Sequence, residues 1–178
     1  MLQITLTKEE VQKFGKLYDY PGDDVELGKK LRIATERGNM TKNDLMAVAR
    51  WKWRGGRTRQ LVSENTAEEI REISTVSFAA KTERMRIGAL LALRGVRWPM
   101  ASVILHFAFP DKYPIFDVRA MNSVGSNTSY TFEKWIDYIK LCRKTATDFD
   151  VSLRVLDRAL WEYDRERGGE GRSRRTVK

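Results

Sequence analysis

Residues 93–117 read LRGVRWPMASVILHFAFPDKYPIFD, and this stretch decides the fold. It begins with a turn that contains Gly95 and continues into an almost wholly apolar segment, 100–109, which predicts a buried helix. A proline-bounded loop follows, and the stretch ends on an acid, Asp117. The pattern therefore predicts two packed helices joined by a tight turn, with the carboxylate of Asp117 at a fixed distance along the chain.

The turn has the chemistry of a phosphate-binding site. The first N–H groups of a helix have no partner within the helix, and the helix dipole adds partial positive charge at that end. Gly95 permits a positive φ and a close approach to a phosphate, and Pro99 suits the first turn of a helix. We expect phosphate contacts from Arg94, Gly95, Val96 and Arg97. A helix-turn-helix corner without a ligand is the alternative that this pattern leaves open.

The charge of the chain favours a polyanionic partner. The 178 residues carry a net charge of +9, and 42% of them are hydrophobic, which is enough for a core. We expect one all-helical domain over residues 1–166. The segment 167–178 holds five basic residues and one acid, with several glycines, and we expect it to form a disordered tail.

Several classes of protein do not fit the composition. No apolar run is long enough to span a bilayer, and the first residues lack a signal-peptide pattern. The single Cys142 excludes an internal disulfide, and one histidine with one cysteine argues against a structural zinc site. We therefore expect a cytoplasmic protein that needs no metal and contacts no membrane.

The remaining chain reads as helices, with almost no strand-like alternation. Thr7 with Glu10, Thr41 with Asp44, and Thr66 with Glu69 are typical helix starts. From these starts and the glycines we expect helices over about 8–17, 25–37, 42–51, 58–63, 67–77 and 118–124, with a hairpin motif at about 82–109. We expect two longer helices to close the fold, marked by apolar stripes at Phe132, Trp135, Ile136 and Ile139 and at Leu153, Leu156, Leu160 and Tyr163.

The hairpin stretch resembles the helix-hairpin-helix (HhH-GPD, endonuclease-III-like) DNA glycosylase superfamily. The hairpin of that family reads Leu-Pro-Gly-Val-Gly, followed by a helix that begins near Thr-Ala. Leu93, Gly95, Val96 and Ala101 stand at the matching places, and Asp117 stands at the distance of the family's essential aspartate. Arg97 replaces the second glycine of the hairpin.

The resemblance implies an all-α glycosylase fold in which Asp117 is catalytic. Members that also cut the strand carry a lysine after the hairpin, where this chain has Pro99. The resemblance therefore implies a monofunctional enzyme that flips a damaged or modified base, hydrolyses its N-glycosidic bond and leaves an abasic site. It also implies no cofactor beyond a monovalent cation at the DNA-bound hairpin. One cysteine cannot supply the iron–sulfur cluster of many relatives.

A second segment with nucleic-acid chemistry is WKWRGGR at 51–57. Aromatic rings among cations suit stacking on bases and contact with phosphates. We expect DNA contacts from Lys52, Arg54 and Arg57, and the resemblance places a wedge into the duplex near Trp53. Trp51 is a candidate for the same base-contacting group, although burial in the core is the alternative reading that we favour for it.

Three further candidates flank the acid. Tyr113 and Phe116 are expected to line a base pocket, or else to pin the loop to the core. Arg119 is expected to contact a phosphate or to orient Asp117. Asp117 also precedes a predicted helix, where aspartate is a common N-cap, and the two roles are compatible.

The sequence leaves three other functions open. The chain could be a non-catalytic helix-hairpin-helix protein that binds DNA through phosphates alone. It could be a glycosylase that removes modified bases from foreign phage DNA in defence. It could also present its basic surface to an acidic protein.

Overall fold

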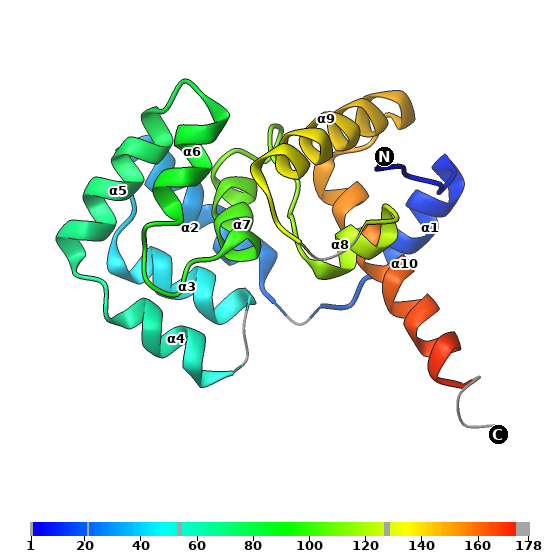
Figure 1. Cartoon of the computed structure of the whole chain (residues 1–178), viewed down its shortest axis with the longest axis horizontal. Coiled ribbons are helices and arrows are strands. Elements are labelled where there is room, and N and C mark those ends of the chain that lie inside the picture. Colours follow the sequence, from blue (N-terminus) through cyan, green and yellow to red (C-terminus); the bar gives the residue numbers. More distant parts are fainter. Residues whose placement is uncertain (1, 21, 53–54, 127–128, 174–178) are drawn as a thin grey trace. The chain divides into compact units, whose positions relative to one another are not determined.

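The computed structural model describes residues 2–20, 22–52, 55–126 and 129–173, with the backbone alone for 169–173. The described residues form helices and no strand, which confirms the all-α prediction (Figure 1). None of these helices is both long and apolar enough to cross a bilayer. The helices are α1 (Lys8–Leu17), α2 (Asp24–Arg37), α3 (Lys42–Lys52), α4 (Gly56–Ser63), α5 (Ala67–Ala79), α6 (Glu83–Leu90), α7 (Trp98–Ala108), α8 (Val118–Ser123), α9 (Phe132–Phe149) and α10 (Leu153–Ser173).

The helix starts lie where the capping residues predict them. Thr7 and Thr66 each form a complete capping box with the glutamate three residues later, at the starts of α1 and α5. Gly38 ends α2 with a φ of 83°, a left-handed conformation that glycine adopts without strain. These boundaries confirm the predicted starts of α1 and α5 and the predicted end of α2, whereas α4 begins two residues earlier and α5 ends two residues later than predicted.

The chain divides into two compact units. Residues 1–20 and 114–178 form the terminal unit, which contains α1, α8, α9 and α10. Residues 21–113 form the central unit, which contains α2 to α7. The hairpin residues therefore belong to the central unit, and Asp117 belongs to the terminal unit.

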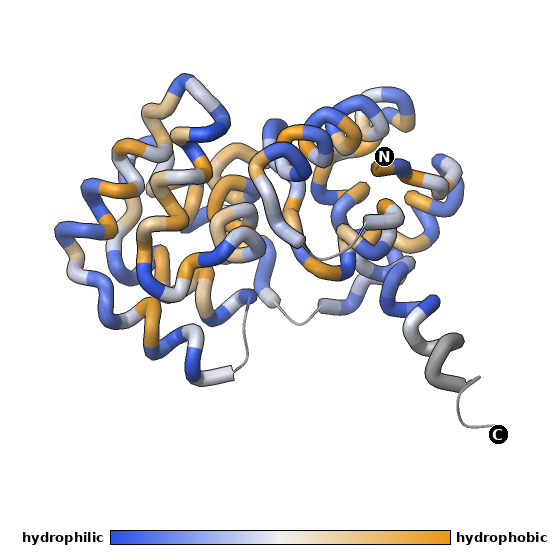
Figure 2. Tube along the Cα trace, viewed as in Figure 1, coloured by the Kyte–Doolittle hydropathy of each residue, from blue (hydrophilic) through white to orange (hydrophobic). Residues whose placement is uncertain are grey.

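The central unit is built around α7. Every residue of this helix from Met100 to Ala108 is buried, as expected for a helix that is apolar on all sides. Helices α2, α3 and α6 pack against it, and Figure 2 shows hydrophobic residues along α7 and on the helices around it. The apolar segment that the sequence singles out is thus the core of this unit.

The terminal unit is built around α10, which packs against α1, α8 and α9. Its apolar stripe includes Leu156 and Leu160, which are 1% and 0% exposed. Helix α9 contributes Trp135 and Tyr138, both fully buried. The two apolar stripes of the last helices therefore form one core.

Helix α10 continues into the segment expected to be a disordered tail. The backbone stays helical to Ser173, past the expected end of the folded part at residue 166. Contacts one helical turn apart support its last described side chains, because Arg165 donates to Glu162 and Arg167 donates to the Tyr163 hydroxyl. Residues 174–178 of the expected tail lie outside the described part of the chain.

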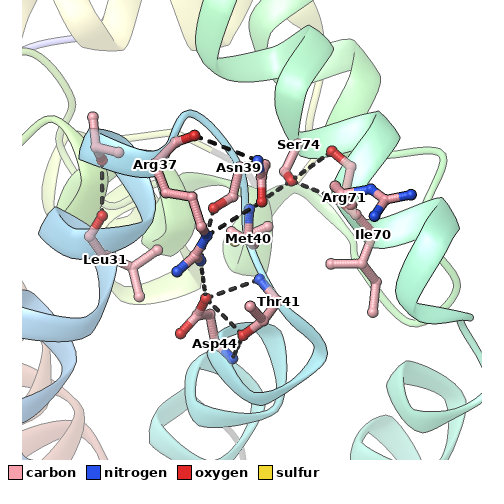
Figure 3. Close-up of polar contacts among 10 residues, drawn as sticks. Leu31, Arg37, Asn39, Met40, Thr41, Asp44, Ile70, Arg71 and Ser74 are labelled. Atoms are coloured by element: carbon pink, nitrogen blue, oxygen red, sulfur yellow. Dashed lines mark hydrogen bonds and ion pairs between the residues drawn. The ribbon is translucent and has the colours of Figure 1, made fainter.

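A polar cluster fixes the turn between α2 and α3 (Figure 3). The Asp44 carboxylate accepts hydrogen bonds from the backbone N–H and the hydroxyl of Thr41, both at 2.8 Å. Arg37 lies 2.6 Å from the same carboxylate and also donates to the carbonyl of Asn39. One acid therefore starts α3 and ties it to the end of α2.

We expect Asp44→Ala to lower the free energy of unfolding by about 1–2 kcal/mol, because it removes the helix-start contacts and leaves Arg37 without its acid. Asp44→Asn keeps an oxygen that accepts from Thr41 and loses only the charge, so its effect should be smaller. Urea denaturation of the three proteins measures the difference. Equal stability of the alanine variant and the wild type would contradict this role.

Candidate functional site

The hairpin between α6 and α7 has the backbone geometry that the sequence predicts for Gly95. Its φ is +76°, in the left-handed region that favours glycine. A Cβ atom at this position would lie 2.9 Å from Val62 Cγ2 and 3.0 Å from Leu61 Cβ. Leu93 and Val96 on either side are 2% and 1% exposed. The turn is therefore held tightly against α4, and only glycine fits its centre.

Two backbone N–H groups of the hairpin are available to a ligand. Those of Gly95 and Arg97 have no hydrogen-bond partner among the described residues. Arg97 is the N-cap of α7 and its side chain makes no capping hydrogen bond. Unpaired N–H groups at the positive end of a buried helix are a candidate anion site.

The two arginines of the hairpin differ in their surroundings. Both are exposed, but Arg94 lies 3.0 Å from the Glu64 carboxylate, whereas Arg97 has no ion pair within the described residues. An exposed pair of this kind contributes little to stability, so a phosphate can displace Glu64 from Arg94. Both side chains can therefore add charge to the anion site.

Asn65 holds this turn in place, although nothing in the sequence marks it as a candidate. Its side chain is 3% exposed and makes two hydrogen bonds with Arg94: Oδ1 accepts from the backbone N–H at 2.8 Å, and Nδ2 donates to the carbonyl at 3.0 Å. Nδ2 also donates to the Val62 carbonyl at 2.9 Å. Asparagine is common in loops, so nothing in the sequence predicts a contact 29 residues away.

The segment 51–57 falls partly outside the described residues. Trp53 and Arg54 are not described, so their predicted roles as wedge and phosphate contact stay predictions. Lys52 is the last residue of α3, and Arg57 is exposed in the first turn of α4, which holds no acid. Helix α4 also carries the residues against which Gly95 packs, so Arg57 and the hairpin share one support.

Trp51 lies in the core of the central unit, 8% exposed. Its Nε1 donates to Asp24 at 3.1 Å, and its ring meets Phe107 edge-on at 5.2 Å. This placement matches the core reading. Contact with a DNA base would require Trp51 to leave these partners.

Asp117 is the N-cap of α8, as predicted. Its Oδ1 accepts from the Ala120 N–H at 3.0 Å, and the residue is 7% exposed. The cap contact uses one carboxylate oxygen and holds the side chain in a fixed orientation. The geometry therefore gives a positioned, largely buried acid at the start of a short helix.

Aromatic residues surround the segment that leads to this acid. Phe116 is fully buried, with ring centroids of Tyr130, Trp135 and Tyr138 at 5.1, 5.5 and 5.4 Å. The Tyr138 hydroxyl donates to the Ile115 carbonyl at 3.1 Å, and burial raises its pKa well above the ordinary value. Phe116 thus pins the segment to the core of the terminal unit.

Tyr113 ends the central unit and is 3% exposed. Its carbonyl lies 2.7 Å from Nδ1 of the buried His106, which fixes the loop after α7. Its ring meets Phe109 at 6.1 Å. Tyr113 and Phe116 are therefore interior residues of their own units, and the base-pocket role expected for them remains a prediction.

Arg119 contacts α10 within the terminal unit. Its Nη1 lies 3.0 Å from the Asp164 carboxylate, and its guanidinium lies over the Trp161 ring at 4.9 Å. The predicted phosphate contact would therefore replace or share the pair with Asp164. The side chain is 37% exposed, so one edge of it is open to solvent.

Tyr130 reports on the charge of Asp117. Burial, and secondly the negative charge of Asp117, raise the pKa of Tyr130 to about 12. An unfolded tyrosine ionises near pH 10, so the unfolded chain loses this proton first. The stability that Tyr130 contributes is therefore fully present below about pH 10 and is lost between about pH 10 and 12.

We expect Asp117→Asn to lower the pKa of Tyr130, because the nearby negative charge is removed while the burial stays. An ultraviolet titration of tyrosinate absorbance measures this, with Tyr130→Phe used to assign the signal. An unshifted Tyr130 transition in the Asp117→Asn protein would contradict the electrostatic contact between the two side chains.

The described residues contain no group of three His, Cys, Asp or Glu side chains that could hold a metal ion. What they offer a ligand is two unpaired N–H groups on the hairpin and, in the terminal unit, a positioned carboxylate. Comparison of the chain with protein-family models, with curated proteins and with solved structures gave no match.

Proposed function

We propose that this protein is a monofunctional DNA N-glycosylase. The observation that carries the proposal is the hairpin itself: a left-handed Gly95 between two buried apolar residues, unpaired N–H groups beside it, and Asp117 at the spacing of the resembled family. Positive net charge supports a DNA partner. Monomeric action on double-stranded DNA within the nucleoid belongs to the same proposal.

The proposed reaction begins with extrusion of a nucleotide from the duplex. Unstacking costs a few kcal/mol, and least for a damaged or poorly paired base. Phosphate contacts from the N–H groups of Gly95 and Arg97 and from the exposed arginines would offset this cost. The hairpin therefore supplies binding and register, and it does not read the sequence of bases.

Asp117 would act at the sugar. Cleavage of the bond between C1′ and the base nitrogen leaves positive charge on the sugar, which an ionised carboxylate stabilises. Water then adds its oxygen to C1′, one of its protons is released, and the departing base takes up a proton. The products are a free base and an abasic site. Pro99 has no amine, so no Schiff base forms at that position and the strand stays intact.

Alkali treatment tests this outcome. DNA that contains a substrate base should acquire breaks only after hot alkali, because an abasic site is stable under mild conditions and alkali-labile. Breaks that appear before alkali would contradict monofunctional action. An absence of labile sites with every substrate would contradict glycosylase activity.

Burial favours one second candidate, a DNA-binding protein without catalysis. Asp117 is 7% exposed and caps α8, so a purely structural role accounts for its contacts. Such a protein would bind duplex DNA with a steep dependence on salt and would release no base. Both candidate functions therefore assign phosphate binding to the hairpin, and they differ only in whether Asp117 is catalytic or structural.

A further inference from the structure

We infer that Asn65 is the positioning residue of the hairpin, and that it sets the affinity of the protein for DNA phosphates. The inference rests on the DNA binding of the proposed function and not on base release. Asn65 lies at the corner between α4 and α5, outside the hairpin motif itself. Its role is to hold the backbone of Arg94 in one conformation, so that the following N–H groups stay in place.

The side-chain amide of Asn65 forms hydrogen bonds to Arg94 and Val62, and this set of hydrogen bonds is called the clasp. Its amide accepts from the N–H of Arg94 and donates to the carbonyl of the same residue, so both backbone groups before Gly95 are fixed. The donation to the Val62 carbonyl anchors the amide to the end of α4. With 3% exposure, the side chain is shielded from water that could replace these bonds.

Van der Waals contacts of Gly95, the residue after Arg94, add to the hydrogen bonds of the clasp. Gly95 lies so close to Leu61 and Val62 that an added Cβ would meet their atoms at 3.0 and 2.9 Å. The α4–α5 corner therefore holds Arg94 by hydrogen bonds and Gly95 by contact. A binding loop held rigid before the ligand arrives loses less conformational entropy on binding. Loss of the clasp should therefore weaken phosphate binding even in a folded protein.

The test compares Asn65→Ala with a matched control, Ser74→Ala. Ser74 is fully buried in the same central unit, accepts from the Met40 N–H at 2.7 Å and donates to the Ile70 carbonyl (Figure 3). Ser74→Ala therefore removes buried hydrogen bonds comparable to those of Asn65, but these hydrogen bonds involve no hairpin residue. Thermal unfolding of each protein, and fluorescence anisotropy with an undamaged DNA duplex well below the melting temperatures, give stability and Kd separately.

We expect Asn65→Ala to raise the Kd roughly tenfold, the effect of losing about one charge-assisted contact. Ser74→Ala should keep the Kd within about twofold of the wild type. It should lower the melting temperature about as much as Asn65→Ala does, because both substitutions remove buried hydrogen bonds. Asn65→Asp keeps the acceptor for the Arg94 N–H and loses both donations, so it should also bind more weakly.

Four outcomes separate the inference from the proposed function. Weak binding by both Asn65 variants, with near-normal binding by Ser74→Ala, supports the inference. Unchanged binding by Asn65→Ala overturns it and leaves the glycosylase proposal standing. Equal weakening in Asn65→Ala and Ser74→Ala overturns it in favour of a general stability effect. A wild-type protein without DNA affinity overturns both.

Discussion

Asp117→Asn should slow base release by about 10³-fold under single-turnover conditions, because it removes the one negative charge proposed to face the cationic sugar. Asparagine is as good an N-cap as aspartate, so the Ala120 N–H keeps its acceptor and stability should change little. The affinity for substrate DNA should stay within a few fold. This substitution thus separates the charge of residue 117 from its structural role.

The matched control is Asp137→Asn, which removes an exposed acid on α9 of the same unit. It should release base at the wild-type rate. Base release and binding are measured on the same duplex, by chromatography and by anisotropy. Wild-type release by the Asp117→Asn enzyme would show that another group supplies the catalysis.

Gly95→Ala should abolish DNA binding and destabilise the central unit. A φ of +76° disfavours any residue with a Cβ, and this Cβ would also meet Val62 and Leu61 at 2.9 and 3.0 Å. The conformational and packing costs together come to about 2–4 kcal/mol. Relief of that strain requires the turn to move, which displaces the N–H groups proposed to hold the phosphates.

Gly88→Ala is the control for this substitution, because Gly88 lies in α6, just before the hairpin, and an added Cβ there meets no atom within 4 Å. Replacing this helical glycine should stabilise the protein by about 0.5–1 kcal/mol and leave DNA binding intact. Thermal unfolding and anisotropy measure both effects. Normal DNA affinity of the Gly95→Ala protein would exclude the hairpin as the site that binds the DNA phosphates.

The capped ends of several helices could be predicted from the sequence because helix capping is local. Thr7 and Thr66 bond to the residue three positions on, and Gly38 stops α2 by its own conformation. The central position of α7 could also be predicted, since a helix without a polar face must be buried. The N-cap role of Asp117 follows from the same local rule.

Contacts between distant residues could not be predicted in this way. The clasp joins Asn65 to Arg94 across 29 residues, and Arg119 pairs with Asp164 across 45. The division into two units depends on α1 packing against α10, at the other end of the chain. No periodicity or spacing in a single sequence records these pairings, because they depend on how whole helices pack.

The most direct test of the account is mass spectrometry of the small molecules released when the purified protein is incubated with duplex DNA. The DNA would carry alkylated, oxidised, deaminated, mismatched and enzymatically modified bases in separate samples. We expect one class of free base, in an amount equal to the alkali-labile sites formed, and none with Asp117→Asn. DNA binding without any released base from the whole set would contradict the account and leave a protein that only binds DNA.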